Sequence, residues 1–146
     1  MKKRTQLFLF GIALFFVAIC DLLLLIMSYQ AGDFSMVTHE DTLVQTVTNT
    51  IIKVILGSSI VSIVVGGYLG LKGMSESRNP SGGGFHIFLA RIAGILNLIL
   101  AVLMGLALLN SSDFSSDIQS FIICVGDMIL MFGYASVAKA VRNGEP

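Results

Sequence analysis

Two aspartates lie inside long apolar stretches of this 146-residue sequence. Asp21 lies within the run 7–29, and Asp127 lies within the run 118–138. A carboxylate surrounded by hydrocarbon costs several kcal/mol, so intramembrane acids usually mark an ion pathway or a polar contact between helices. Two interpretations therefore stay open: a proton or cation site, and a structural clamp of hydrogen-bonded, neutral aspartates.

The two acids are predicted to lie close together. At a rise of about 1.5 Å per residue, Asp21 lies about 12 Å and Asp127 about 13.5 Å from the outer ends of their runs. The first and last helices of a closed four-helix bundle are neighbours. Adjacent carboxylates cannot both be ionised cheaply, so the pair would share a proton or hold a cation. Lys53 is the third candidate in this proton or cation site, although its position on the second run also favours a side chain that reaches to water.

No other group of residues indicates catalysis. The sequence contains no serine–histidine–acid set, no nucleotide-binding motif and no regular array of metal ligands, so we expect neither an enzyme nor a bound cofactor or metal. The run His39-Glu40-Asp41 is interpreted as a solvated helix cap rather than a metal cluster. Cys20 and Cys124 are interpreted as small packing residues, with a redox pair as the less favoured alternative.

Composition excludes the common soluble classes. Apolar residues make up 55% of the chain and charged residues only 12%, about half the share in a soluble domain. Nine basic and nine acidic residues balance, so the chain has no basic surface for nucleic acid. We therefore expect the lipid bilayer, not water, to surround most of the protein.

Four apolar runs are long enough to cross a bilayer. They cover 7–29, 51–71, 88–109 and 118–138, and about 20 apolar residues in a helix span the hydrocarbon layer. The first run is longer than the apolar part of a signal peptide, so we expect it to be retained. The second helix is predicted to begin near Thr42, and 73–84 is predicted to be a flexible connector. The predicted fold is all-α: a single domain, 1–146, that forms an integral membrane antiparallel four-helix bundle.

Basic residues indicate the orientation of this bundle. Eight of the nine fall on one side: Lys2, Lys3, Arg4, Lys72, Arg78, Arg91, Lys139 and Arg142. The positive-inside rule then places both termini in the cytoplasm, and we expect a multi-pass protein of the bacterial plasma membrane. Arg91 is expected to contact a lipid headgroup, or Glu76 in the adjoining connector. His86 and Tyr134 are expected at the membrane interface, where aromatic side chains act as anchors.

Small residues predict how the helices pack, because helices in lipid need close backbone approach or polar contacts. One row at four-residue spacing consists of Ser58, Ser62, Gly66 and Gly70, and a second consists of Ala93, Asn97, Ala101 and Gly105. The two rows predict a close contact between the second and third helices, within one chain or between two copies. A polar seam on the fourth run, formed by Ser120, Cys124, Asp127, Met131 and Tyr134, is predicted to face protein.

These features favour an accessory or interaction subunit, or a self-assembling membrane component. Its expected partners are the lipid bilayer and either another membrane protein or further copies of itself. The alternative is a small proton- or cation-coupled transporter or channel component that uses Asp21 and Asp127.

Overall fold

The protein is all-α in the computed structural model, which describes residues 2–32, 42–80, 83–110 and 114–144. Four helices account for nearly all of these residues. They are α1 (Lys3–Ala31), α2 (Thr42–Arg78), α3 (Phe85–Asn110) and α4 (Phe114–Arg142). The predicted start of the second helix near Thr42 is confirmed. The predicted cap at 39–41 lies outside the described residues.

Two helix ends follow directly from the sequence. Gly32 ends α1 in the left-handed conformation, with φ at 83°, and its N–H donates to the carbonyl oxygens of Ser28 and Tyr29. Glycine adopts this conformation without a steric penalty and satisfies the otherwise unpaired carbonyls of the last turn. Pro80 follows the end of α2, and its ring disfavours helical backbone at Asn79.

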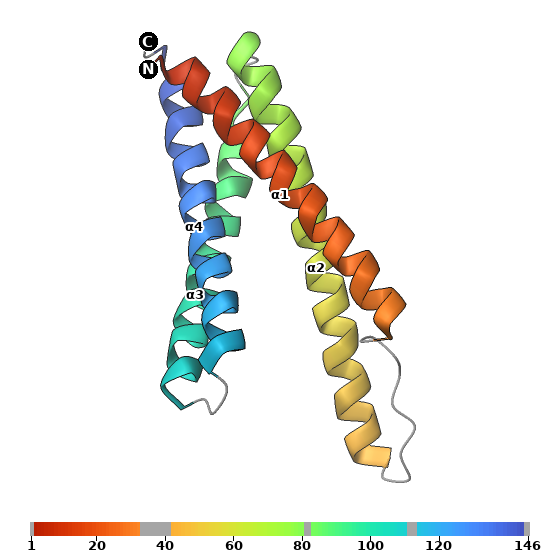
Figure 1. Ribbon diagram of the computed structural model, residues 1–146. Helices are drawn as coiled ribbons and strands as arrows, with labels where there is room; N and C mark the ends of the chain where they lie inside the picture. Colours follow the sequence, from red (N-terminus) through yellow and green to blue (C-terminus); the bar gives the residue numbers. More distant parts are fainter. Residues whose placement is uncertain (1, 33–41, 81–82, 111–113, 145–146) are drawn as a thin grey trace.

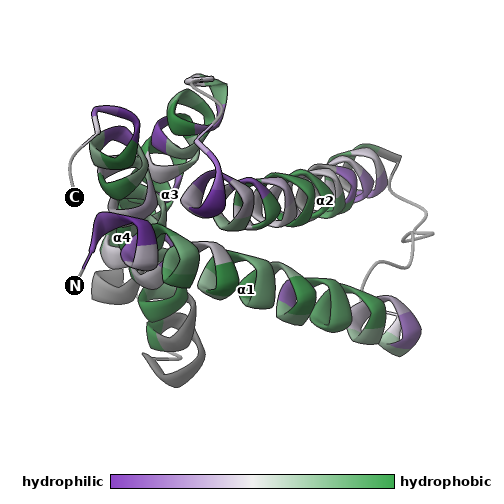
Figure 2. Ribbon diagram, turned by 90° about the horizontal axis from the view of Figure 1, so that it is seen from above, coloured by the Kyte–Doolittle hydropathy of each residue, from purple (hydrophilic) through white to green (hydrophobic). Residues whose placement is uncertain are grey.

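All four helices are long and apolar enough to cross a membrane. The apolar segments are Lys3–Ala31, Leu56–Arg78, Phe85–Leu103 and Phe121–Arg142. Within the protein, only 17% to 28% of the most apolar 18-residue stretch of each segment is buried. Large apolar side chains are therefore exposed on all four helices, and apolar residues recur along each of them (Figure 2). A soluble protein rarely exposes such a surface. The four helices thus suggest a multi-pass membrane protein.

The helices are arranged as two pairs (Figure 1). α1 packs along α2, and α3 packs along α4, whereas α2 makes few contacts with α3 or α4. The pairs meet at the end of the molecule that holds both termini, where α1 also packs on α4, and they diverge toward the other end. The predicted neighbours α1 and α4 do touch, but the arrangement is more open than a closed four-helix bundle.

The small-residue row on α2 packs against α1, not against α3 as expected. A Cβ built on Gly70 would lie 2.7 Å from the backbone nitrogen of Phe15 and 2.9 Å from the carbonyl oxygen of Gly11. A Cβ on Gly66 would lie 3.4 Å from that of Ala18. The row therefore brings two backbones together, as predicted, but the opposing helix is the one that precedes it in the chain.

The second small-residue row lies on α3, which packs against α4. A Cβ on Gly105 would meet the ring of Phe121 at 3.4 Å, and one on Gly94 would lie 3.2 Å from the ring of Phe132. Ala101 is buried, and Ala93 and Asn97 are partly buried. Glycines on α3 thus leave room for aromatic rings of α4.

The central core lies where the two pairs meet. Its largest fully buried side chains are Leu7 and Leu14 from α1, Leu69 from α2 and Tyr134 from α4, and Met131 from α4 is also buried there. Leu7, Gly11, Leu14 and Ala18 are the buried residues of α1, at alternating spacings of four and three residues. This spacing keeps one face of a helix against its neighbours. The core therefore fixes the convergent end of the protein.

The predicted connector 73–84 is helical over its first half. α2 continues through Gly73 to Arg78, and Glu76 and Ser77 on this extension are buried. Ser77 Oγ donates a 2.7 Å hydrogen bond to the carbonyl oxygen of Met74. The glycines and serines misled the prediction because burial against neighbouring helices outweighs their weak helix propensity.

Candidate functional site

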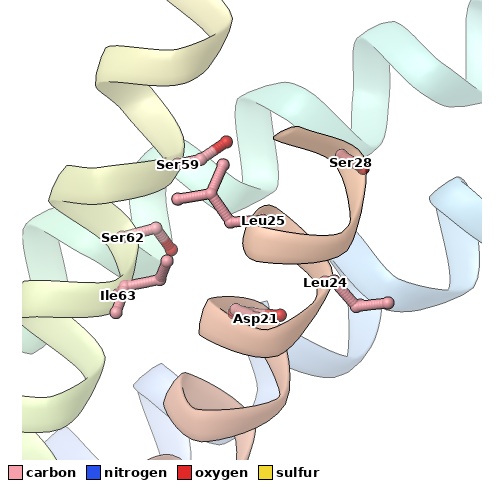
Figure 3. Close-up of a pocket in the computed structure, with 7 residues that line it drawn as sticks. All are labelled: Asp21, Leu24, Leu25, Ser28, Ser59, Ser62 and Ile63. Atoms are coloured by element: carbon pink, nitrogen blue, oxygen red, sulfur yellow. The ribbon is translucent and has the colours of Figure 1, made fainter. Parts of the chain in front are cut away.

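Asp21 lines a pocket between α1 and α2 (Figure 3). The pocket has a volume of about 310 Å³. Its lining consists of Asp21, Leu24, Leu25 and Ser28 from α1 and Ser59, Ser62 and Ile63 from α2. Leu25 projects toward α2, and the serines of α2 project toward α1 (Figure 3). The buried face of α1 continues at the same spacing from Ala18 to Asp21, Leu25 and Ser28, which explains why the acid faces α2.

The pocket combines one carboxylate with three hydroxyl groups. Carboxylate and hydroxyl oxygens accept hydrogen bonds and are the ligands that hard cations prefer. A volume of about 310 Å³ has room for several water molecules, since each occupies about 30 Å³ in the liquid. This arrangement is able to hold a hydrated proton or cation, and it equally satisfies a neutral aspartic acid by hydrogen bonding.

Asp127 lies on the face of α4 that points toward the other pair. Met131 and Tyr134, four and seven residues further along, are buried on the same face, and Asp127 itself is half-buried. The carboxyl of Asp127 is close enough to Asp21 for their charges to interact. Asp127 does not line the pocket of Asp21, so a shared site of the two acids stays a prediction.

Lys53 is separate from these acids. It is exposed on α2, ahead of the apolar segment that begins at Leu56. Over the described part of the chain it forms no ion pair, and it does not line the pocket. Cys20 and Cys124 are free thiols and half-buried.

A second polar cluster occupies the convergent end of the protein, and the sequence analysis did not identify it. Lys72 and Glu76 on α2 form an ion pair with 3.0 Å between Nζ and Oε1. Glu76 and His86 are only 5% and 3% exposed. The rings of His86 and Tyr134 pack edge to face, with their centroids 6.1 Å apart. The cluster links α2, α3 and α4.

Two of these positions correct the sequence analysis. Tyr134 and His86 were expected at the membrane interface, but Tyr134 is fully buried and His86 is nearly so. The spacing of Tyr134 from Met131 on the polar seam was the available signal for its burial. His86 had no such signal, because its burial depends on how the start of α3 packs against the other helices.

The roles of the remaining candidate residues stay predictions. Arg91 is exposed on α3, as a contact to a lipid headgroup requires. Ser58 and Ser62 are exposed beyond the close contact at Gly66 and Gly70. Among the described residues no three histidine, cysteine or acidic side chains gather as metal ligands, and the run His39-Glu40-Asp41 lies outside those residues.

Comparison with protein-family models, curated proteins and solved structures found no match to this chain.

Proposed function

We propose that this protein is a multi-pass plasma-membrane protein with both termini in the cytoplasm, and that it acts as an accessory subunit of another membrane protein. The two termini and the connection between α2 and α3 lie at the same end of the molecule (Figure 1). Eight of the nine basic residues belong to this end. Basic residues are retained on the cytoplasmic side during insertion, which supports this orientation.

One observation carries the accessory role: the two helix pairs diverge, with half-buried Asp21 in the pocket between α1 and α2 and half-buried Asp127 on the face of α4 toward the other pair. In the described residues neither Asp21 nor Asp127 forms an ion pair with a basic side chain. Acids inside a membrane usually pair with a polar or basic group. A transmembrane helix of a partner protein, carrying a lysine, arginine or amide side chain, would supply that group.

Photo-cross-linking at two neighbouring positions of α1 tests this proposal. Both side chains are exposed, but Leu24 lines the pocket with Asp21, whereas Leu23 does not and lies about 200° around the helix from Asp21. A photoreactive phenylalanine analogue is placed at each position in turn, in the full chain in its native membrane. We expect position 24, and not position 23, to cross-link to a transmembrane helix that carries a basic or amide residue.

Dependence on the acids distinguishes this adduct from incidental capture. The adduct should disappear in the Asp21→Asn/Asp127→Asn variant and remain in Asp117→Asn, which changes an acid ahead of the apolar segment of α4. An adduct of twice the chain mass would replace the accessory role with self-assembly. An adduct that persists without the acids, or lipid adducts alone, would contradict the proposal.

The pocket at Asp21 favours a second candidate, a proton- or cation-coupled transport component. Its carboxylate and three serine hydroxyls provide oxygen ligands next to a second acid, as intramembrane proton and cation pathways do. Purified protein in vesicles containing a pH-sensitive dye would then dissipate a proton or sodium gradient. Flux should fall at least about tenfold in Asp21→Asn, because this change removes the carboxylate that lines the pocket and intramembrane acids carry proton and cation pathways, and it should stay unchanged in Asp117→Asn. Equal flux in both variants would eliminate this candidate.

A further inference from the structure

A basic pocket lies between the first turn of α1 and the last turns of α4. It has a volume of about 340 Å³ and is lined by Lys3 from α1, by Ser136, Val137, Lys139 and Ala140 from α4, and by Asn143 just after α4. In the part of the chain that the structure describes, neither lysine pairs with a carboxylate. The residues that line this pocket thus carry two ammonium groups, a hydroxyl and an amide. This set of donors suits a phosphate group.

An apolar groove continues from this pocket along the same two helices. The groove has a volume of about 410 Å³ and is lined by Gln6, Leu9, Phe10, Ala13, Leu130 and Val137. Val137 lines both the pocket and the groove. The ring of Phe10 forms part of the groove and packs closely on Gly133 of α4. A Cβ built on Gly133 would lie only 2.7 Å from this ring. The absence of a side chain at Gly133 thus allows the ring to pack down on α4.

The length of the combined site matches one leaflet of a bilayer. From Lys3 to Ala13 a helix rises about 15 Å, which is half of the roughly 30 Å hydrocarbon thickness. The polar end lies next to the termini, and the apolar end lies toward the middle of α1 and α4. A molecule that fills both parts must carry an anionic head and an extended apolar chain.

We propose that the site binds one anionic phospholipid from the leaflet nearest the two termini. Its phosphate lies between Lys3 and Lys139, and one acyl chain lies in the groove between α1 and α4. This inference does not depend on the proposed partner protein, because the site lies between α1 and α4, away from the pocket of Asp21. It assigns a role to Lys3 and Lys139 beyond their contribution to orientation.

Native mass spectrometry of the full chain tests the proposal. The protein is released from micelles that contain phosphatidylglycerol or phosphatidylcholine with identical acyl chains. We expect one phosphatidylglycerol to be retained in preference to phosphatidylcholine. In the Lys3→Gln/Lys139→Gln variant, the retained fraction of phosphatidylglycerol should fall at least about tenfold. Each lysine near an anionic surface contributes measurably to binding.

A matched variant separates this site from general surface charge. Lys2→Gln/Arg4→Gln removes the same two charges from the same end, at positions that do not line the pocket, and should retain the lipid as the native chain does. Ala13→Leu fills the groove and should weaken retention with both lysines present. Circular dichroism and gel filtration verify that each variant is folded.

Three results would overturn the proposal. Equal retention of the two lipids would show that the lysines do not select an anionic headgroup. Equal losses in the two double variants would reduce the effect to nonspecific charge. Competition by glycerol 3-phosphate at the concentration of the lipid would show that the pocket binds a soluble phosphate and that the groove contributes nothing.

Discussion

Gly11 on α1 and Gly70 on α2 bring their backbones into direct contact. A Cβ built on either glycine would lie 2.9 Å from the carbonyl oxygen of the other. Such a distance leaves no room for a side chain at either position. Close backbone approach is a main source of attraction between helices in lipid, where apolar side chains gain little by leaving an equally apolar solvent. The Gly11–Gly70 contact therefore holds the first helix pair together.

Gly70→Ala should destabilise the protein by about 1–3 kcal/mol, the usual cost of overpacking. The new methyl group would also lie 2.7 Å from the backbone nitrogen of Phe15, and backbone atoms cannot move aside as a side chain can. The free energy of unfolding in mixed micelles, from a titration with dodecyl sulfate, measures the effect.

Two neighbouring glycines provide controls for Gly70→Ala. A Cβ on Gly66 makes an ordinary contact at 3.4 Å, and one on Gly67 meets nothing within 4 Å. Alanine at either position should leave the free energy of unfolding unchanged or slightly raised, since alanine favours a helix over glycine. A loss at Gly67 equal to that at Gly70 would attribute the effect to the backbone of α2 rather than to its contact with α1.

Tyr134→Phe is expected to preserve or raise stability, although the side chain is fully buried. Among the described residues the Oη atom of Tyr134 has no hydrogen-bond partner, and leaving such a group unsatisfied costs about 1–3 kcal/mol. Tyr134→Ala, in contrast, should cost about 3–5 kcal/mol because it empties the core. Thermal unfolding in detergent compares the two variants. A clear loss in Tyr134→Phe would demonstrate a hydrogen bond from the hydroxyl, for example to a buried water.

Lys72→Met should destabilise the convergent end by about 2 kcal/mol, between the values for exposed and buried ion pairs. The variant leaves the carboxylate of Glu76, whose side chain is 7% exposed, without the ammonium 3.0 Å away. Lys72→Met/Glu76→Gln should recover much of this loss because it removes the buried charge. A double-mutant cycle on the free energy of unfolding provides the test, and additive losses would exclude coupling between the two residues.

The sequence predicts the elements of this fold better than their arrangement. Long apolar runs identify all four helices because a membrane requires continuous helices of about 20 residues. The seam on α4 was interpreted correctly where Met131 and Tyr134 are buried, because helical periodicity depends only on local spacing. The partner of the row at Gly66 and Gly70 was wrong, since small residues show that a face packs closely but not against which helix.

The sequence likewise identifies some residues of the candidate sites and misses others. Asp21 and Asp127 are visible in the sequence because a carboxylate in an apolar run is rare, and the structure places Asp21 in a pocket between α1 and α2 that Asp127 does not line. The cluster of Glu76, His86 and Tyr134 was missed because a glycine- and serine-rich segment resembles a connector. Its burial arises only when three helices converge, and no local pattern encodes that contact.

Accessibility of single cysteines tests the proposed orientation of the chain. Gln30, near the end of α1, and Asn79, just after α2, are both exposed, and the C-terminal ends of α1 and α2 lie at opposite ends of the molecule (Figure 1). Each is replaced by cysteine in a chain whose own thiols are removed by Cys20→Ala and Cys124→Ala. With the basic residues held in the cytoplasm, a membrane-impermeant maleimide should label Gln30→Cys in intact cells and Asn79→Cys only after lysis. The reverse pattern would invert the orientation, and labelling of both in intact cells would mean that α2 does not cross the membrane.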